Sequence, residues 1–273
     1  MLIHKYTFNL SLIDNIISII NNKYKDLFLA VIVHGSVATD EVTTFSDFDG
    51  LLIVKDEFVN SKKLKRFKKE TLKQIILFDP LQHHGWFQIK ESELLNYPES
   101  YFPNEILNYS KLIYPLVETL ELEININKNP DYILGLSNML NSFENRIKSN
   151  WTPSNIFQLK SVLSQIMLIP SLYYSAKYNK GIFKKYSFDA VRNDFNDKEW
   201  YAIKRASETR NTWAYQLNYF QQLIMRRPEK VFRKITQKYI APKLNKNLEW
   251  DRSMYESLEL LIIKIKISLN ETH

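Results

Sequence analysis

The stretch VIVHGSVATDEVTTFSDFDGLLIV, residues 31–54, holds two apolar runs that are joined by a polar segment. The first run ends in Gly35-Ser36, and the second opens with Asp47-Phe48-Asp49. Short β-branched runs bounded by glycine and polar residues predict buried strands, here over 27–35 and 48–54. Two acidic residues at the start of a buried strand lose solvation free energy, so there must be a physical reason for their position.

A shared cation is one such reason. Side chains two residues apart on a strand share a face and lie roughly 6.5–7 Å apart, so Asp47 and Asp49 point the same way. Carboxylates this close repel each other unless a cation lies between them, and Mg²⁺ prefers oxygen ligands and binds phosphates as well. Gly35 lets a ligand approach the backbone closely. We predict that Ser36 caps the next helix, where its hydroxyl and amide face a phosphate. The alternative is an Asp-rich turn with Ser36 as a plain helix cap.

This combination of a hydrophobic strand, Gly-Ser, a ten-residue spacer and Asp-x-Asp resembles the signature of the DNA polymerase β-like nucleotidyltransferase superfamily. The residues that match are Gly35, Ser36, Asp47 and Asp49. The resemblance implies a small mixed sheet flanked by helices. It also implies transfer of a nucleoside monophosphate, expected to be AMP, from a nucleoside triphosphate such as ATP to a hydroxyl. Two Mg²⁺ ions roughly 3.5–4 Å apart would assist an in-line displacement.

The superfamily usually has a third carboxylate on the next strand, and the predicted strand 85–89 contains no acid. His84 is one substitute, because a neutral imidazole can bind a metal or accept a hydroxyl proton. Asp79 and Glu91 could reach the site only through loops. Alternatively His84 is part of a packed surface pair, a homodimer partner completes the site, or the chain binds a nucleotide without transferring it.

The predicted fold class is α+β, with a nucleotidyltransferase domain over 1–125 and a helical, substrate-binding domain over 126–273. In the first domain the apolar spacing predicts helices over 9–28 and 60–78, and we interpret the N-terminus as the first amphipathic helix. Residues 92–115 are predicted to form a helical, proline-punctuated connection, and 121–130 a linker. Helices are predicted in the second domain over 131–149, 154–178, 187–194, 197–225, 228–237 and 250–268.

The second domain resembles that of aminoglycoside nucleotidyltransferases, especially the 4′ class. In that class a helix bears a glutamate base and, one turn later, a lysine that touches the triphosphate. The matching residues are Glu144 and Lys148, although the same spacing is also typical of a surface ion pair. Lys184 is predicted to lie in a loop that could meet phosphates, before Ser187 as a cap. The alternative is a solvated loop.

Charge and composition limit the possible partners and binding sites of the chain. Residues 1–125 have a net charge of −4 and the remainder +11, which favours a polyanion as partner. The alternative is that genome bias alone makes the composition of the second half basic. The absence of cysteine excludes disulfides and thiolate metal sites. No run of 18 apolar residues and no cleavable leader is present, so we expect a cytoplasmic protein that does not enter a membrane.

Three functions follow. The first is transfer of a nucleotide to a small molecule such as an aminoglycoside or sugar, for which Glu144, Asp189 and Glu208 could line a pocket. The second is an RNA-directed enzyme, such as a toxin that modifies transfer RNA, which the basic second half favours. The third is a nucleotide-binding protein that lacks full catalysis.

Overall fold

The computed structural model describes residues 1–273 except 45, 82–83, 127–129, 214, 245–249 and 271–273. The chain divides into two compact units. The first unit comprises Met1–Lys128 and Gln216–Ala241, and the second comprises Asn129–Tyr215 and Pro242–His273. The first unit thus contains the whole of the predicted first domain. It also takes in a segment from the middle of the predicted second domain.

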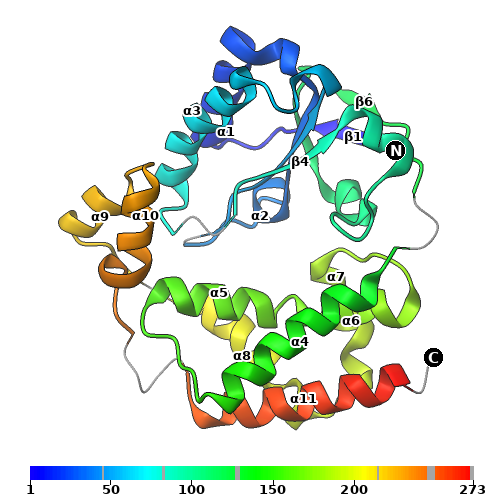
Figure 1. Ribbon diagram of the computed structural model, residues 1–273, viewed down its shortest axis with the longest axis vertical. Helices are drawn as coiled ribbons and strands as arrows, with labels where there is room; N and C mark the ends of the chain where they lie inside the picture. The colour runs from blue at the N-terminus through cyan, green and yellow to red at the C-terminus, as the bar shows by residue number, and fades with distance from the viewer. Residues whose placement is uncertain (45, 82–83, 127–129, 214, 245–249, 271–273) are drawn as a thin grey trace. The chain divides into compact units, whose positions relative to one another are not determined.

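A six-stranded mixed sheet forms the centre of the first unit, in the order β4-β3-β2-β5-β1-β6. Its strands β1, β4 and β6 are labelled in Figure 1. β2 is antiparallel to β3 and β5, whereas β4 runs parallel to β3 and β1 parallel to β5. The sheet confirms the predicted α+β class and the predicted strands 27–35, 48–54 and 85–89. The strand bounds are Leu2–Lys5 (β1), Phe28–His34 (β2), Asp49–Val54 (β3), Trp86–Lys90 (β4), Lys111–Tyr114 (β5) and Thr119–Glu121 (β6).

Both faces of this sheet are covered, so β2 and β3 are apolar on both sides. The helices α1 (Ser11–Ile19) and α3 (Lys62–Phe78) cover one face, where Leu52 and Val54 join the core. Segment 91–109, with two stretches of 3₁₀ helix, covers the other face, where Leu51 and Ile53 are buried. This alternation follows from the two-residue period of a strand.

Two predictions for the first unit are right only in part. The N-terminus begins with strand β1 rather than with the first helix, whereas the predicted helix 9–28 is present as α1, which starts at Ser11, and a π-helical turn, Ile20–Tyr24. The connection over 92–115, predicted to be helical, contains 3₁₀ helices but ends in strand β5. The strands β1, β5 and β6 span only three or four residues each. Runs this short leave little periodicity to detect.

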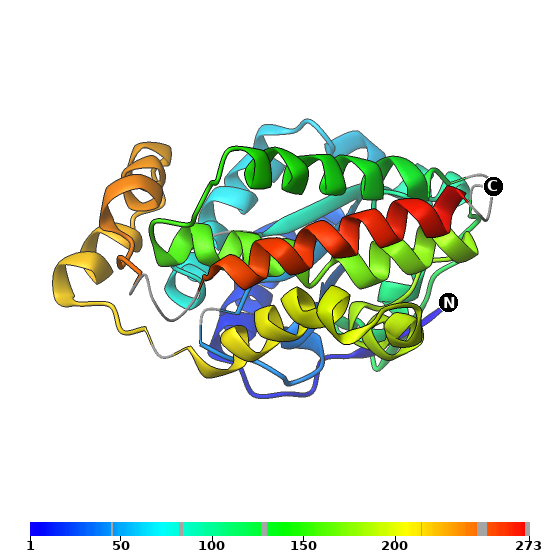
Figure 2. The ribbon, with the colours of Figure 1, turned by 90° about the horizontal axis from the view of Figure 1, so that it is seen from below.

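The second unit consists of helices, as predicted for a helical bundle. Its C-terminal helix packs on α8, α4 and α6 (Figure 2). The predicted helix 154–178 is two helices, because α5 ends at Ile166 and Pro170 lies in the first turn of the next. The bounds are Tyr132–Lys148 (α4), Ile156–Ile166 (α5), Ile169–Tyr178 (α6), Lys184–Val191 (α7), Asp197–Thr212 (α8) and Arg252–Asn270 (α11).

The predicted helix over 197–225 is likewise interrupted. α8 ends at Thr212, and α9 (Tyr219–Met225) begins only after Asn218, whose side chain caps it. α10 (Lys230–Ile235) and a π-helical turn, Thr236–Ile240, follow. These three elements contact one another. They belong to the segment Gln216–Ala241 of the first unit.

Candidate functional site

Gly35 links β2 to the four-residue helix α2 (Gly35–Ala38) and brings the two halves of the sequence motif together. Its φ angle is +65°, a conformation that disfavours every side chain with a Cβ atom. A Cβ atom at this position would also lie only 2.8 Å from Oδ2 of Asp49. The antiparallel pairing of β2 with β3 explains this contact, since it places His34 directly opposite Asp49. The Gly-Ser turn and the Asp-x-Asp segment therefore meet at one end of the sheet.

Phe48 separates the two aspartates and turns into the core under α1 and α3. It is fully buried, and its ring centroid lies 4.9 Å from that of Trp86 on β4. Asp49 begins β3 and shares the face of Leu51. Oδ1 of Asp47 is buried, although both aspartate residues remain partly accessible. Rigid packing of Phe48 fixes the backbone that positions both carboxylates.

His84 reaches Asp49 from the loop before β4. Its Nδ1 lies 2.7 Å from Oδ1 of Asp49, and because a carboxylate only accepts, the ring nitrogen donates. Alternation along the predicted strand puts His84, Trp86 and Gln88 on one face, and this prediction is wrong for His84, which lies in the loop before β4. Trp86 and Gln88 point to the face opposite Asp49, where they contact Thr71 and Lys68 of α3. His84, one of the groups proposed in place of the third carboxylate, is therefore in contact with Asp49. Asp79 is buried at the end of α3, and its Oδ1 accepts the N–H of Leu81.

His34 is a polar residue at this site that the sequence analysis did not single out. It is 8% exposed, and its ring lies 5.6 Å from that of Phe87 and 4.8 Å from that of Phe102. Within the described part of the chain, Nε2 has no hydrogen-bond partner. Burial lowers the pKa of His34, the nearby charge of Asp49 opposes this, and His84 adds to the lowering. The position directly before Gly-Ser is the sequence signal that could have identified it.

The donor set at Asp47 and Asp49 fits Mg²⁺ that is shared with phosphate groups. No group of three His, Cys, Asp or Glu side chains that could hold a metal ion occurs among the described residues. Mg²⁺ does not need such a group, because it usually takes one or two carboxylates together with water and substrate phosphates. Because Gly35 has no Cβ atom, the side of the turn next to Oδ2 of Asp49 is open; a Cβ atom there would lie 2.8 Å from this oxygen.

The prediction that Ser36 caps the next helix is wrong. The cap position of α2 is His34, which makes no side-chain capping bond, and Ser36 lies inside the first turn. The backbone carbonyl of Ser36 accepts the N–H of Glu41. Ser36 still lies next to Gly35, so it remains a candidate phosphate contact beside Asp49.

The residues predicted from the second domain lie in the second unit. Glu144 pairs with Lys266 of α11 at 2.6 Å and Lys148 is exposed, so the carboxylate is engaged by another helix. Lys184 is the first residue of α7 rather than part of a loop. Ser187 does not cap this helix, because its hydroxyl donates to the carbonyl of Lys184 at 2.6 Å.

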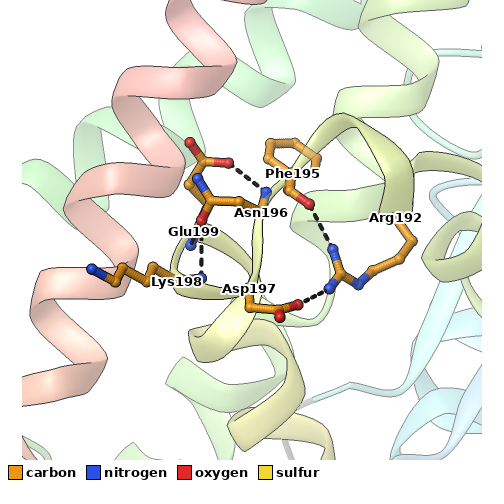
Figure 3. A network of polar contacts seen from close by, with 6 residues as sticks. All are labelled: Arg192, Phe195, Asn196, Asp197, Lys198 and Glu199. Atoms are coloured by element: carbon orange, nitrogen blue, oxygen red, sulfur yellow. Dashed lines mark hydrogen bonds and ion pairs between the residues drawn. The ribbon is translucent and has the colours of Figure 1, made fainter.

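A hollow of about 270 Å³ lies in the second unit, where Asp189 and Glu208 both line its wall. Phe188 and Trp200 supply apolar walls. Arg192, another lining residue, is held in place because it bonds to the Phe195 carbonyl and the Asp197 carboxylate (Figure 3). Its guanidinium also stacks 5.5 Å from the Trp200 ring centroid. Two of the three acids predicted to line a pocket therefore do so.

No protein-family model and no curated protein matches this chain. Among solved structures, the chain is similar to spectinomycin adenyltransferase AAD(9) from Enterococcus faecialis, in a crystal structure with ATP and spectinomycin. The two share 12% sequence identity at a TM-score of 0.48, over 84% of this chain and 100% of the other. None of the helices in the described ranges has both the length and the apolar character needed to cross a bilayer.

Proposed function

We propose that this chain is a nucleotidyltransferase that moves a nucleoside monophosphate, AMP in the first instance, to a hydroxyl of a small molecule. The proposal depends on one observation. Gly35 has a positive φ and packs against the carboxylate of Asp49, which places the Gly-Ser turn beside the Asp-x-Asp segment. The signature that residues 31–54 resemble needs this juxtaposition to hold a nucleoside triphosphate.

In the proposed reaction the oxygen of the acceptor hydroxyl attacks the α-phosphorus of the triphosphate. A new P–O bond forms, the bond from the α-phosphorus to the oxygen that bridges to the β-phosphorus breaks, and pyrophosphate leaves. Asp47 and Asp49 would hold Mg²⁺, which would supply positive charge against the phosphate oxygens. Gly35 and Ser36 contact the phosphates from the turn.

We assign His84 to the reacting end of this site. Because Nδ1 donates to Asp49, the neutral ring has its lone pair on Nε2, which can accept the proton of the acceptor hydroxyl. Glu144 as a base, and Lys148 and Lys184 as contacts to the triphosphate, stay predictions from the resemblance of the second domain. Within its own unit, Glu144 is paired with Lys266.

The hollow in the second unit supports a small acceptor such as an aminoglycoside or another amino sugar. Its carboxylates, Asp189 and Glu208, suit amine groups, and the rings of Phe188 and Trp200 suit the apolar faces of a sugar. Arg192 and Lys204 line the same hollow, so its charges balance, and they suit the hydroxyl oxygens of such an acceptor. RNA is the second candidate acceptor, which the net charge of +11 over residues 126–273 favours.

The test is transfer of label from α-labelled ATP, CTP, GTP and UTP, with Mg²⁺, to a set of aminoglycosides and to total RNA. Asp47→Asn and Asp49→Asn should each lower transfer at least about 100-fold, because each removes charge that opposes the phosphates. Asp14→Asn is the matched control, since Asp14 is an exposed aspartate of α1 in the same unit.

Each outcome has a distinct meaning. Label in a small molecule that disappears in the Asp47 and Asp49 variants supports the proposal. Label in RNA identifies the second acceptor class. Binding of nucleotide without transfer to any acceptor would contradict the proposed reaction and leave a nucleotide-binding protein. Loss of activity in Asp14→Asn would mean that the substitutions act through stability.

A further inference from the structure

The segment Gln216–Ala241 differs in charge and in exposed side chains from an ordinary connection. It contains six basic residues and one acidic residue, Glu229. The basic residues are Arg226, Arg227, Lys230, Arg233, Lys234 and Lys238. A local excess of five positive charges in 26 residues attracts polyanions and is screened by salt.

This segment has ordered local structure. Asn218 and Gln221 form a capping box at the start of α9, in which each side chain binds the other residue's backbone N–H. Nε2 of Gln221 donates to the carbonyl of Ile240 at 2.9 Å, which ties α9 to the π-helical turn after α10. Met225 and Thr236 are buried inside the segment. The charges are therefore presented on a fixed scaffold.

Large apolar side chains are exposed on the same scaffold. Tyr219 is 83% exposed and Tyr239 69%, and the exposed fraction of Phe220 is 58%. Leu223 and Val231 are exposed as well. Isolated exposed apolar residues are common, but several aromatic rings within one short segment mark a surface for interaction.

Basic and apolar side chains share faces instead of dividing between them. Tyr219, Leu223 and Arg226 follow one another at i, i+4 and i+7, and Val231 and Lys234 at i, i+3. A helix that lies in a membrane interface separates its apolar face from its charged face, which this segment does not do. The helices α9 and α10 are also short, with seven and six residues. Mixed aromatic and basic surfaces are instead typical of proteins that bind single-stranded nucleic acids, where rings stack on bases and cations contact phosphates.

We propose that residues 216–241 form a binding surface for single-stranded RNA. In this surface Arg226, Arg227 and Lys234 contact phosphates, while Tyr219 and Tyr239 stack on bases. Lys238 already lies 5.1 Å from the ring centroid of Tyr239, which places a cation beside a stacking ring. The inference does not depend on the transfer reaction, because RNA binding is measured without a nucleoside triphosphate.

The test is fluorescence anisotropy of a labelled, unstructured RNA of roughly 20 nucleotides, titrated with the full chain at about 50 to about 200 mM salt. The triple variant Arg226→Glu, Arg227→Glu, Lys234→Glu should weaken binding at least about tenfold. It should also lower the slope of log Kd against log salt by about 2, since each lost phosphate contact accounts for about 0.7. Tyr219→Ala and Tyr239→Ala should each weaken binding about fivefold or more.

The matched control carries the same change of charge on another exposed basic surface of the first unit, Lys65→Glu, Arg66→Glu, Lys69→Glu on α3. This control should bind RNA with at most a threefold change. Equal loss in both triple variants would overturn the proposal, because binding would then follow net charge alone. Binding of vesicles that contain anionic lipid by the wild type but not by the first triple variant, with no RNA binding, would also overturn it. The tyrosine variants keep the test valid if the charge variants unfold.

Discussion

Gly35→Ala should destabilise the fold and distort the candidate site at once. Alanine at a φ of +65° costs roughly 1–2 kcal/mol, because the Cβ atom crowds the backbone in the left-handed region. The new Cβ atom would also lie 2.8 Å from Oδ2 of Asp49, closer than ordinary van der Waals contact. Asp49 cannot simply rotate away, since its other oxygen lies 2.7 Å from Nδ1 of His84. Movement of the carboxylate therefore breaks that hydrogen bond or displaces the loop before β4.

Together these effects should lower the free energy of unfolding by about 2 kcal/mol, which corresponds to a urea midpoint about 1 M lower for a typical slope. Gly135→Ala is the matched control. Gly135 is exposed in the interior of α4, and no atom within 4 Å would contact its added Cβ. Alanine there should raise stability by about 0.5–1 kcal/mol, because it favours the helix.

Gly35→Asn separates the two contributions, since asparagine tolerates the left-handed conformation but still has a Cβ atom. We expect its stability to lie between those of wild type and Gly35→Ala, with nucleotide transfer as low as in Gly35→Ala. Urea unfolding followed by circular dichroism gives the stabilities. An unchanged midpoint for Gly35→Ala, or an equal decrease for Gly135→Ala, would refute the proposed contact between the turn and Asp49.

Three further predictions concern the packing around the site and between the helices. Gly50→Ala should lower the free energy of unfolding by about 1–3 kcal/mol in urea titrations, because its Cβ would lie 2.4 Å from the Trp86 ring; an unchanged emission spectrum and midpoint would contradict this. Ser257→Ala should cost about 1–2 kcal/mol in the same assay, since Ala202 N–H loses its buried acceptor at 2.8 Å, and Ser257→Thr should cost less. His34 has a lowered pKa because it is buried, so stability is full above the ordinary value of about 6.5 and decreases below it, where unfolding takes up a proton. Urea midpoints in EDTA at about pH 7.5 and about pH 5.5 test this, and His34→Phe should show a smaller difference than wild type.

The centre of the fold could be predicted from the sequence because its signals are local. β2 and β3 are apolar on both faces and end in glycine or polar residues, which identifies buried strands without any knowledge of their neighbours. α3 shows a clear apolar stripe above a basic face. These elements contain Gly35, Asp47 and Asp49 or directly adjoin them, so the motif could be located as well.

The parts of the fold that the sequence did not predict depend on contacts between distant parts of the chain. β1 is stabilised by pairing with β5 and β6, more than 100 residues later in the sequence. The return of Gln216–Ala241 to the first unit is also a tertiary property. The sequence pattern predicted helices here, over 197–225 and 228–237, but no local pattern indicates which unit a helix joins.

The difference between local patterns and tertiary contacts also applies to the third carboxylate, which the resemblance predicts and which β4 does not have. Asp49 and Leu51 share one face of β3. On β4 the residue on this face is Phe87, which is the pairing partner of Leu51. Phe87 packs against His34 and Phe102, with ring centroids 5.6 Å from each. A carboxylate in this aromatic cluster would lose its solvation without gaining a partner. His84 approaches instead from the loop, where no periodicity applies and 44% of its side chain is exposed.

In the proposed reaction, His84 in place of a third carboxylate would have a consequence for metal binding. A third carboxylate adds negative charge and binds a metal directly, whereas a neutral imidazole that donates to Asp49 withdraws electron density from that ligand. We therefore expect weaker Mg²⁺ binding in the wild type than in a variant with an acid in the loop. His84→Asp should lower the Mg²⁺ concentration needed for half-maximal transfer, and His84→Gln should raise the KM for the acceptor less than it lowers kcat. If His84→Asp needs more Mg²⁺ than the wild type, His84 is itself a metal ligand and its contact with Asp49 opens when the metal binds.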